Sequence, residues 1–169
     1  MKIRTTPVPS EHTAPNHDHR DCVDRALRVA EELCAQREVR LTPIRRKVLE
    51  LIWESHRAVK AYDLLDRIKP YERTAKPATV YRALEFLMEQ CLIHRVESLN
   101  AFIGCNCSEQ RHEQLLLICE RCGNVEERMG ADVMLAVAKE VEQAGFTLHR
   151  KAIEIHGLCA DCRKAEGGT

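Results

Sequence analysis

Two Cys-x-x-Cys motifs constrain this chain more than any other feature: Cys119-Glu-Arg-Cys122 and Cys159-Ala-Asp-Cys162. Four thiolates in two tight pairs complete a tetrahedral zinc shell and leave no open position for chemistry. The spacing therefore favours a structural zinc site over a disulfide or an active site. The alternative is two separate redox motifs, but nothing near either one resembles a thioredoxin-like unit. Because 36 residues separate Cys122 from Cys159, a folded element has to lie between the two pairs.

The composition indicates a folded protein of one domain or two small ones. The chain has 169 residues, of which 44% are hydrophobic and only 4% aromatic, so its cores are mostly aliphatic. No apolar run is long enough to cross a membrane, and the polar N-terminus is not a secretory signal, which predicts a cytoplasmic protein. In a reducing compartment, nine cysteines point to metal or thiol chemistry.

The charge distribution is weakly asymmetric. The net charge is zero, but residues 1–98 carry 18 Lys and Arg against 15 Asp and Glu, whereas residues 99–169 carry 8 against 11. The sign suits a first half that faces nucleic acid, although ordinary surface variation would give the same difference.

The first half has the pattern of a winged helix-turn-helix. Apolar spacing predicts helices over 22–37 and 61–68, and two more that open at Thr42-Pro43, where the threonine hydroxyl would cap the helix, and at Lys76-Pro77. Cys91 would lie in the buried stripe of the fourth helix. Short strands at 93–97 and 101–104 would form the wing. In this arrangement the fourth helix is the candidate recognition helix.

The second half predicts a small α/β unit. Its strands would span 115–119, 125–128 and 146–156, and an amphipathic helix over 131–144 would end at Gly145. The fold class is therefore α+β, with an N-terminal winged helix-turn-helix domain followed by a small α/β unit that holds the structural zinc. The predicted boundaries are a tail at 1–20, the winged helix at 21–104, a hinge at 105–111, the second domain at 112–165 and a tail at 166–169, with a loose chain after Arg163.

A second set of metal-ligand residues lies around the predicted hinge. Cys105, Cys107 and His112 are close in sequence, with His94 upstream and Glu127 downstream. A metal site built from both halves would form only when the halves hold one relative orientation, which is what a metal sensor requires. Scattered ligands are weak evidence by themselves, since such residues are more often packing or surface residues.

Several motifs in combination resemble the ferric uptake regulator family. They are Leu41-Thr42-Pro43-x-Arg45, Ala61-Tyr62-Asp63-Leu64-Leu65 and Ala78-Thr79-Val80-Tyr81-Arg82-Ala83-Leu84. Three further stretches are similar to its zinc uptake regulator branch: Cys34-Ala35-Gln36-Arg37 running to Leu41-Thr42-Pro43, Ile118–Gly123, and His156-Gly157-Leu158-Cys159-Ala160-x-Cys162. The resemblance covers about residues 22–163.

The resemblance implies a homodimeric, metal-responsive repressor that binds double-stranded DNA, has no catalytic role and carries two zinc ions per protomer. It also implies that the small α/β unit with the structural zinc is the dimerisation domain. The regulatory site of zinc-type members corresponds to His94, Cys105, His112 and Glu127. The His-rich run of iron-type members is absent, and a thiolate at Cys105 favours zinc over ferrous iron. Cys107 could compete as a ligand, and His149 and His156 are candidates for a further metal site or are simply surface and strand residues.

Six residues are the predicted DNA contacts. Arg82 would read guanine, and Tyr81 would pack on a thymine methyl or a phosphate. Thr79, Tyr62, Arg45 and Arg46 would hold phosphates, although the two arginines could equally be a solvated helix face.

Three other interpretations stay open from the sequence. A metal-dependent peroxide or iron sensor would share the fold. A redox-thiol protein could use Cys105 and Cys107, and a zinc-storage protein would bind metal without DNA. A zinc deaminase is disfavoured, because no His-x-Glu triplet or Pro-Cys-x-x-Cys is present.

Overall fold

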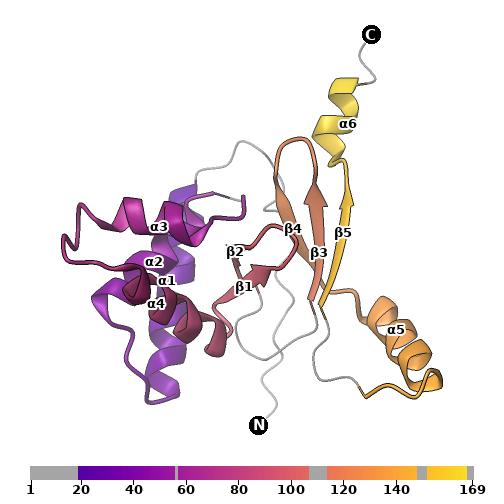
Figure 1. Ribbon diagram of the computed structural model, residues 1–169, viewed down its shortest axis with the longest axis horizontal. Helices are drawn as coiled ribbons and strands as arrows, with labels where there is room; N and C mark the ends of the chain where they lie inside the picture. Colours follow the sequence, from indigo (N-terminus) through magenta and orange to yellow (C-terminus); the bar gives the residue numbers. More distant parts are fainter. Residues whose placement is uncertain (1–18, 56, 107–113, 148–151, 167–169) are drawn as a thin grey trace.

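The computed structural model describes residues 19–55, 57–106, 114–147 and 152–166, and Figure 1 shows a helical part joined through a hairpin to a separate sheet. The helical part comprises α1 (His19–Gln36), α2 (Pro43–Trp53), α3 (Ala61–Ile68) and α4 (Pro77–Glu89), followed by the hairpin strands β1 (Ile93–Val96) and β2 (Ala101–Gly104). The second part comprises β3 (Gln114–Cys119), β4 (Val125–Arg128), α5 (Ala131–Gln143), β5 (Ala152–Gly157) and α6 (Ala160–Glu166). The predicted α+β class is confirmed.

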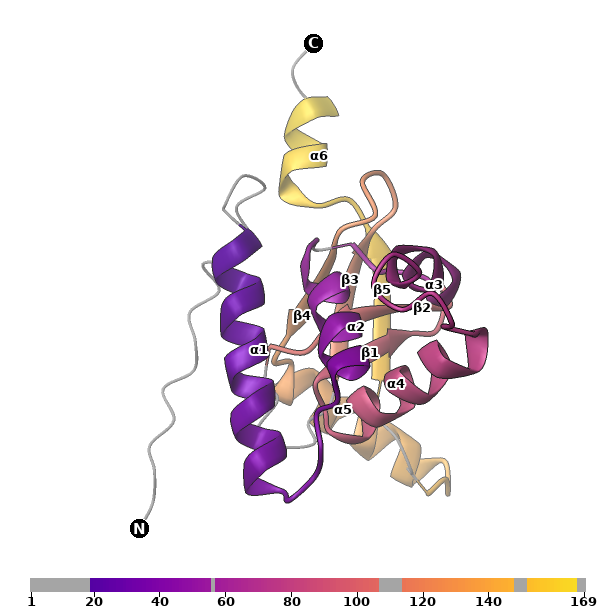
Figure 2. The ribbon, with the colours of Figure 1, turned by 90° about the vertical axis from the view of Figure 1, so that its left-hand side faces the viewer.

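An aliphatic core holds the four N-terminal helices together. Each helix has one apolar face, and these faces converge so that α1 and α4 both pack on α2, as Figure 2 shows from the side of the helices. The side chains with almost no exposed surface at the centre of this core are Val48, Leu49, Ile52, Leu64, Ile68, Val80, Leu84 and Leu87. With α3 and α4 packed against each other ahead of the hairpin, the helical part has the element order of a winged helix.

The β1–β2 hairpin is buried on both of its faces. Side chains alternate between the two faces of a strand, and here Ile93 and Phe102 join the helical core. Val96 and Ile103 point the other way and form a second apolar cluster with residues of the sheet. His94 lies opposite Ile103 in the register, so the same alternation directs its side chain toward the sheet. The hairpin is thus a layer shared by the two parts of the molecule.

The sheet has the strand order β4-β3-β5. The central strand β3 pairs antiparallel with β4 and parallel with β5, and the parallel pairing requires a crossover, which α5 supplies. Leu116, Ile118 and Val125 lie on the face that packs against the hairpin, and this is the second apolar cluster. The members of this cluster come from the hairpin and from the sheet. Burial of their apolar surface therefore stabilises one orientation of the helical part relative to the sheet.

Several details differ from the sequence prediction. Helix α1 begins at His19 rather than at Cys22, and so starts inside the predicted tail of residues 1–20. Thr42 lies at the N-cap of α2 in an extended conformation, but its side chain makes no capping hydrogen bond, so Pro43 at the first helical position marks this helix start. Cys91 is not on the buried stripe, because it follows the end of α4 with a φ of 58° and is only half-buried.

The third strand of the sheet begins at Ala152 rather than at Phe146, which is exposed. The chain beyond Arg163 is not loose up to residue 166, because it continues α6.

Helix α5 leaves part of its apolar surface exposed. Met134 is the buried residue of this helix, and Val133 and Leu135 are exposed along with Met129, Phe146, Ile155 and Leu158 in the same part of the chain. A run of large exposed apolar side chains on a small α/β unit is typical of a protein–protein contact surface. Within the described residues, no helix has both the length and the apolar character that crossing a membrane requires.

We expect Gly104→Ala to destabilise the protein, because a Cβ atom there would lie 2.2 Å from the Trp53 ring. Overpacking of this kind costs about 1–3 kcal/mol. Urea unfolding followed by fluorescence measures the change, since Trp53 is the single tryptophan of the chain. Gly157→Ala is the matched control, because nothing lies within 4 Å of the Cβ position there. Equal stabilities of the two variants would contradict this packing.

Candidate metal centres

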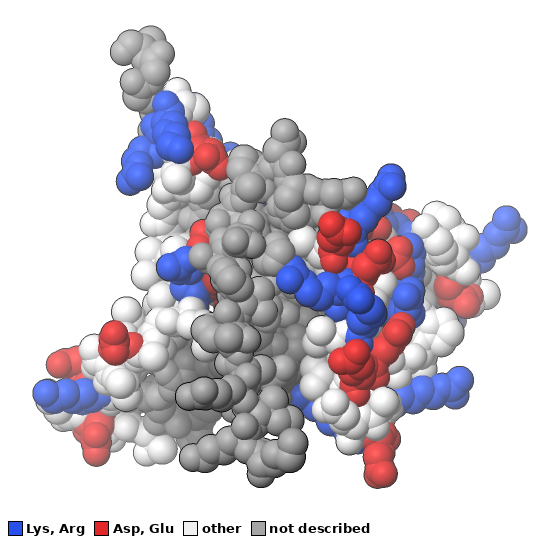
Figure 3. Space-filling model, turned by 180° about the vertical axis from the view of Figure 1, so that it is seen from behind, with Lys and Arg blue, Asp and Glu red and all other residues white. Residues whose placement is uncertain are grey.

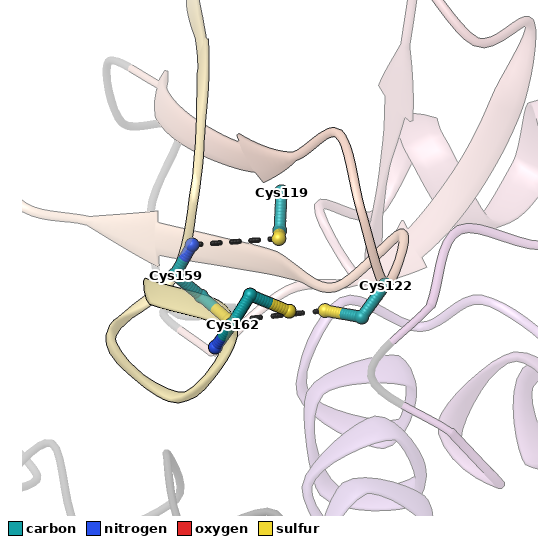
Figure 4. A group of neighbouring side chains, drawn as sticks. All are labelled: Cys119, Cys122, Cys159 and Cys162. Atoms are coloured by element: carbon teal, nitrogen blue, oxygen red, sulfur yellow. Dashed lines mark hydrogen bonds between the residues drawn. The ribbon is translucent and has the colours of Figure 1, made fainter. Parts of the chain in front are cut away.

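The four cysteines of the two Cys-x-x-Cys motifs come together at one end of the sheet (Figure 4). Cys119 ends β3 and Cys122 lies in the β3–β4 turn, whereas Cys159 and Cys162 flank the start of α6. All four sulfur atoms lie within 4.8 Å of one another, and the Cys122 and Cys159 sulfurs are 3.8 Å apart. Four thiol ligands with no other group among them match a closed structural zinc site.

Local backbone geometry aims these sulfurs at one point. The Gly123 N–H donates to the Cys119 carbonyl at 2.9 Å, and the positive φ of Gly123, 72°, lets the turn close tightly after Cys122. On the other side, the N–H of Cys159 donates to the Cys119 sulfur at 3.4 Å. The N–H of Cys162 donates to the Cys159 sulfur at 3.5 Å. Backbone donors to sulfur favour thiolates, which are the form that binds metal.

The four thiols differ in acidity in the metal-free protein. Hydrogen bonds from the backbone N–H groups of Cys122 and Cys159 lower the pKa of Cys119 from its ordinary value of 9.0 to about 6. Loss of solvent, followed by the neighbouring thiols of Cys159, Cys122 and Cys119, raises the pKa of Cys162 to about 12. Mutual repulsion therefore stops the four groups from ionising together unless a cation is bound.

A second cluster joins the hairpin to the sheet. His94 on β1 and Cys105 just after β2 are both buried, and Glu127 comes from β4. The His94 Nε2 and Glu127 Oε1 atoms are 2.7 Å apart, and one donor atom from each of the three residues lies within 4.8 Å of the others. Imidazole, thiolate and carboxylate together form a donor set suited to zinc.

Two further residues orient this cluster. The Gln114 amide lies 2.7 Å from the His94 Nδ1 atom, which leaves Nε2 as the ring nitrogen directed at Glu127. The Asn106 N–H donates to the second Glu127 oxygen at 3.0 Å. Such contacts fix the tautomer and rotamer of metal ligands. The sequence prediction missed both residues, and only their positions beside Cys105 and His112 in the chain could have drawn attention to them.

The other predicted ligands have separate outcomes. His112, Cys107 and His149 lie outside the described residues. His156 is exposed on β5, opposite Ile118, and belongs to neither of the clusters found among the described residues.

The aromatic and arginine side chains predicted to contact DNA are mostly exposed. Tyr62 on α3 is 71% exposed, Tyr81 on α4 is 45% exposed, and Arg82 is also exposed. Thr79 is half-buried, and its hydroxyl oxygen accepts the Lys76 N–H at 3.3 Å, which helps to start α4. These residues share the α3–α4 region, where a winged helix contacts the major groove.

Arg45 and Arg46 are less free to contact DNA. The Arg45 guanidinium stacks 3.6 Å from the centre of the Phe86 ring and donates to the Arg40 carbonyl at 2.7 Å, so packing is part of its role. Arg46 pairs with Glu31 of α1 at 2.9 Å beside a charged groove between α1 and α2. In Figure 3 acidic and basic side chains intermingle on this part of the molecule, so this face presents no uniform positive surface.

The comparisons with known proteins agree with this geometry. The profile of the ferric uptake regulator family matches residues 36–156, which is most of the chain. This chain belongs to the ferric uptake regulator family. Within the family it is 46% identical to the zinc uptake regulation protein of Escherichia coli (strain K12) over 141 residues, or 83% of this chain and 82% of that protein.

Two proteins of known structure are also similar to this family member. A zinc uptake regulator complexed with zinc and DNA is 42% identical, with a TM-score of 0.79 over 90% of this chain and 99% of that one. Holo XcZur is 39% identical, with a TM-score of 0.77 over 83% and 99% of the two chains. Apo XcZur has the same identity over 85% and 99%, but its TM-score is only 0.50. The arrangement described above is therefore closer to the holo form than to the apo form.

We expect one thiol of the metal-free four-cysteine cluster to titrate near pH 6. The pKa of Cys119 is lowered on folding, so its thiolate contributes stability that is present above the unfolded pKa and is lost as the pH falls through about 6. Ultraviolet absorbance of thiolate during an acid titration measures this step. Cys119→Ser should remove it and Cys162→Ser should retain it; a step that survives Cys119→Ser would contradict the assignment.

Proposed function

We propose that this protein is a zinc-responsive, DNA-binding transcriptional repressor of zinc-uptake genes, with zinc as its co-repressor. The observation that carries the proposal is the convergence of His94 and Cys105 from the winged-helix part with Glu127 from the sheet, at a point that fixes how the two parts are oriented. The similarity to the zinc uptake regulation protein of E. coli supports the same function. The protein is a cytoplasmic regulator and has no enzymatic role.

The structural zinc is assigned to Cys119, Cys122, Cys159 and Cys162. These residues tie the end of β3 to the segment that follows β5, so the site closes over α5 and the whole sheet. A small α/β unit has a marginal core of its own, and closing such a site adds binding free energy to folding.

The regulatory zinc is assigned to His94, Cys105, His112 and Glu127, at a hinge that spans residues 105–111. Zinc bound there would supply a positive charge that offsets the Glu127 carboxylate, which lies beside His94 and Cys105. The thiolate of Cys105 argues against the iron sensor, because ferrous sites rely on imidazole and carboxylate ligands. It also argues against a metal-dependent peroxide sensor of the same family.

Zinc occupancy would change DNA binding through the relative orientation of the two parts. His94 lies on the hairpin and Glu127 lies on the sheet. Zinc that binds both residues would therefore stabilise one orientation of the winged-helix part relative to the sheet. The difference between holo and apo XcZur, with TM-scores of 0.77 and 0.50 against this chain, supports such a change within the family.

DNA reading is assigned to α4 in a homodimer. The exposed apolar residues around α5 would form the dimer contact, and two copies of α4 would then enter successive major-groove half-sites. Arg82 would read guanine and Tyr81 would pack beside it, while Thr79, Tyr62, Arg45 and Arg46 would hold the backbone. The contacts of Arg45 with Phe86 and of Arg46 with Glu31 make these two the weaker members of the set.

A redox-thiol protein and a zinc-storage protein are less well supported. Neither would need a winged helix, and Cys105 is buried against His94 and Glu127 rather than exposed to oxidants. Storage alone would also leave the exposed Arg82 and Tyr81 of α4 without a role.

We expect DNA binding to depend on buffered free zinc. A gel-shift titration should give tight binding only above a threshold of zinc concentration. Cys105→Ser combined with His112→Ala should abolish the response, because it removes two of four ligands and leaves the four-cysteine site intact. Zinc-independent binding by the wild type, or a full response by the double variant, would contradict the proposal.

We expect Arg82→Ala to remove sequence selectivity while metal content stays the same. A bidentate arginine–guanine contact contributes about 1–3 kcal/mol of discrimination, or roughly 5- to 150-fold. Competition of operator against random DNA measures the ratio. The matched control is Arg163→Ala, an exposed arginine on α6, far from α4 in Figure 1. An unchanged ratio for Arg82→Ala would exclude this residue as the base reader.

A further inference from the structure

A carboxylate of the sheet binds the tip of the wing. Glu154, in the middle of β5, accepts the backbone N–H of Glu97 at 2.6 Å and that of Ser98 at 3.1 Å. These donors stand at the start of the β1–β2 turn, more than 50 positions away in the chain. Hydrogen bonds to a charged acceptor are stronger than neutral ones, and here one carboxylate satisfies two consecutive N–H groups.

Strand register places Glu154 in line with the metal cluster. Leu116 on the central strand β3 pairs with Glu127 of β4 on one side and with Glu154 of β5 on the other. Residues that lie opposite each other in neighbouring strands project from the same face of the sheet. Glu127, Leu116 and Glu154 therefore form one row across the sheet, and this row faces the hairpin.

The two carboxylates hold opposite ends of that hairpin. Glu127 meets His94 and the Asn106 N–H at the base of the wing, where the second metal cluster lies. Glu154 meets the turn at its tip. Between them Leu116 has no exposed surface and packs in the cluster that contains Val96 and Ile103. Glu154 supplies the attachment at the end that has no metal ligand.

We propose that Glu154 is a positioning residue: it holds the wing turn on the sheet and thereby lowers the zinc concentration at which the second site converts the protein to its DNA-binding arrangement. This inference rests on the proposed function. Among the described residues, Glu154 belongs to neither cluster of possible metal ligands, so its role in the proposal is to hold the wing turn. It stabilises the orientation in which His94, Cys105 and Glu127 converge, so less of the free energy of zinc binding is spent on ordering the wing.

The first arm of the test measures the attachment of the wing turn to Glu154, and it needs neither zinc at the second site nor DNA. In the intact dimer, amide hydrogen exchange at Glu97 and Ser98 should become at least about tenfold faster in Glu154→Gln. The amide side chain of that variant keeps a single acceptor oxygen and turns a donor toward a donor. Glu140→Gln, on the exposed surface of α5, is the matched control and should leave both amides unchanged.

The second arm measures the consequence. Glu154→Gln should raise the free zinc needed for half-maximal DNA binding about 3- to 10-fold, in line with the loss of charge-assisted hydrogen bonds, and saturating zinc should restore most of the affinity. Zinc retained in the four-cysteine site by both variants shows that the sheet is intact. A merely structural role would lower that retention and leave the zinc midpoint of the folded fraction in place.

Separate results would overturn the separate claims. Unchanged hydrogen exchange at Glu97 and Ser98 would reject the claim that Glu154 holds the wing turn. Faster exchange with an unchanged zinc midpoint rejects the positioning role and leaves the zinc-dependent repressor intact. Zinc-independent DNA binding by the wild type would instead defeat the proposed function, and the exchange result would still decide whether Glu154 holds the wing.

Discussion

The β1–β2 hairpin is the layer on which the rest of the molecule depends, because both of its faces are buried. Ile93 and Phe102 pack into the helical core, whereas Val96 and Ile103 pack on the sheet. A strand can serve two cores only if its side chains alternate strictly, and a slip of one residue would exchange the two sets. The same alternation delivers His94 to the sheet side. One backbone register therefore sets domain packing and metal-ligand placement together.

The two metal centres differ in the parts of the molecule that they join. The four cysteines bring the end of β3 together with the segment that follows β5, and all of them lie within the second part of the molecule. The cluster of His94, Cys105 and Glu127 spans two parts, so its free energy of metal binding is linked to their relative orientation. The apolar cluster between hairpin and sheet already favours one orientation, which means that ligands at the interface need only shift an existing equilibrium.

Much of the fold could be predicted because its signals are local. The apolar pattern placed α3 over 61–68 and the strand β4 over 125–128 with the bounds that the structure has, and prolines marked the starts of α2 and α4. Errors arose where local signals compete with packing. The hydroxyl of Thr42 forms no capping bond at the start of α2. Cys91 continues the apolar spacing of α4 but follows the end of that helix and is only half-buried. The metal-cluster assignments were harder, since ligands from distant segments have no fixed spacing.

The sequence by itself determined every helix and strand except α6, the four cysteines whose spacing suits zinc and, through its motifs, the family. Only the tertiary structure decided that Gln114 and Asn106 orient His94 and Glu127, that Arg45 stacks on Phe86, and that Glu154 binds the wing turn. The physical reason is that helix and strand formation depends on neighbours in the chain, whereas these contacts depend on register between strands that are distant in sequence. In the sequence, Glu154 cannot be told apart from an exposed acidic residue. Its pairing with Leu116 of β3 places it on the face of the sheet that packs against the hairpin.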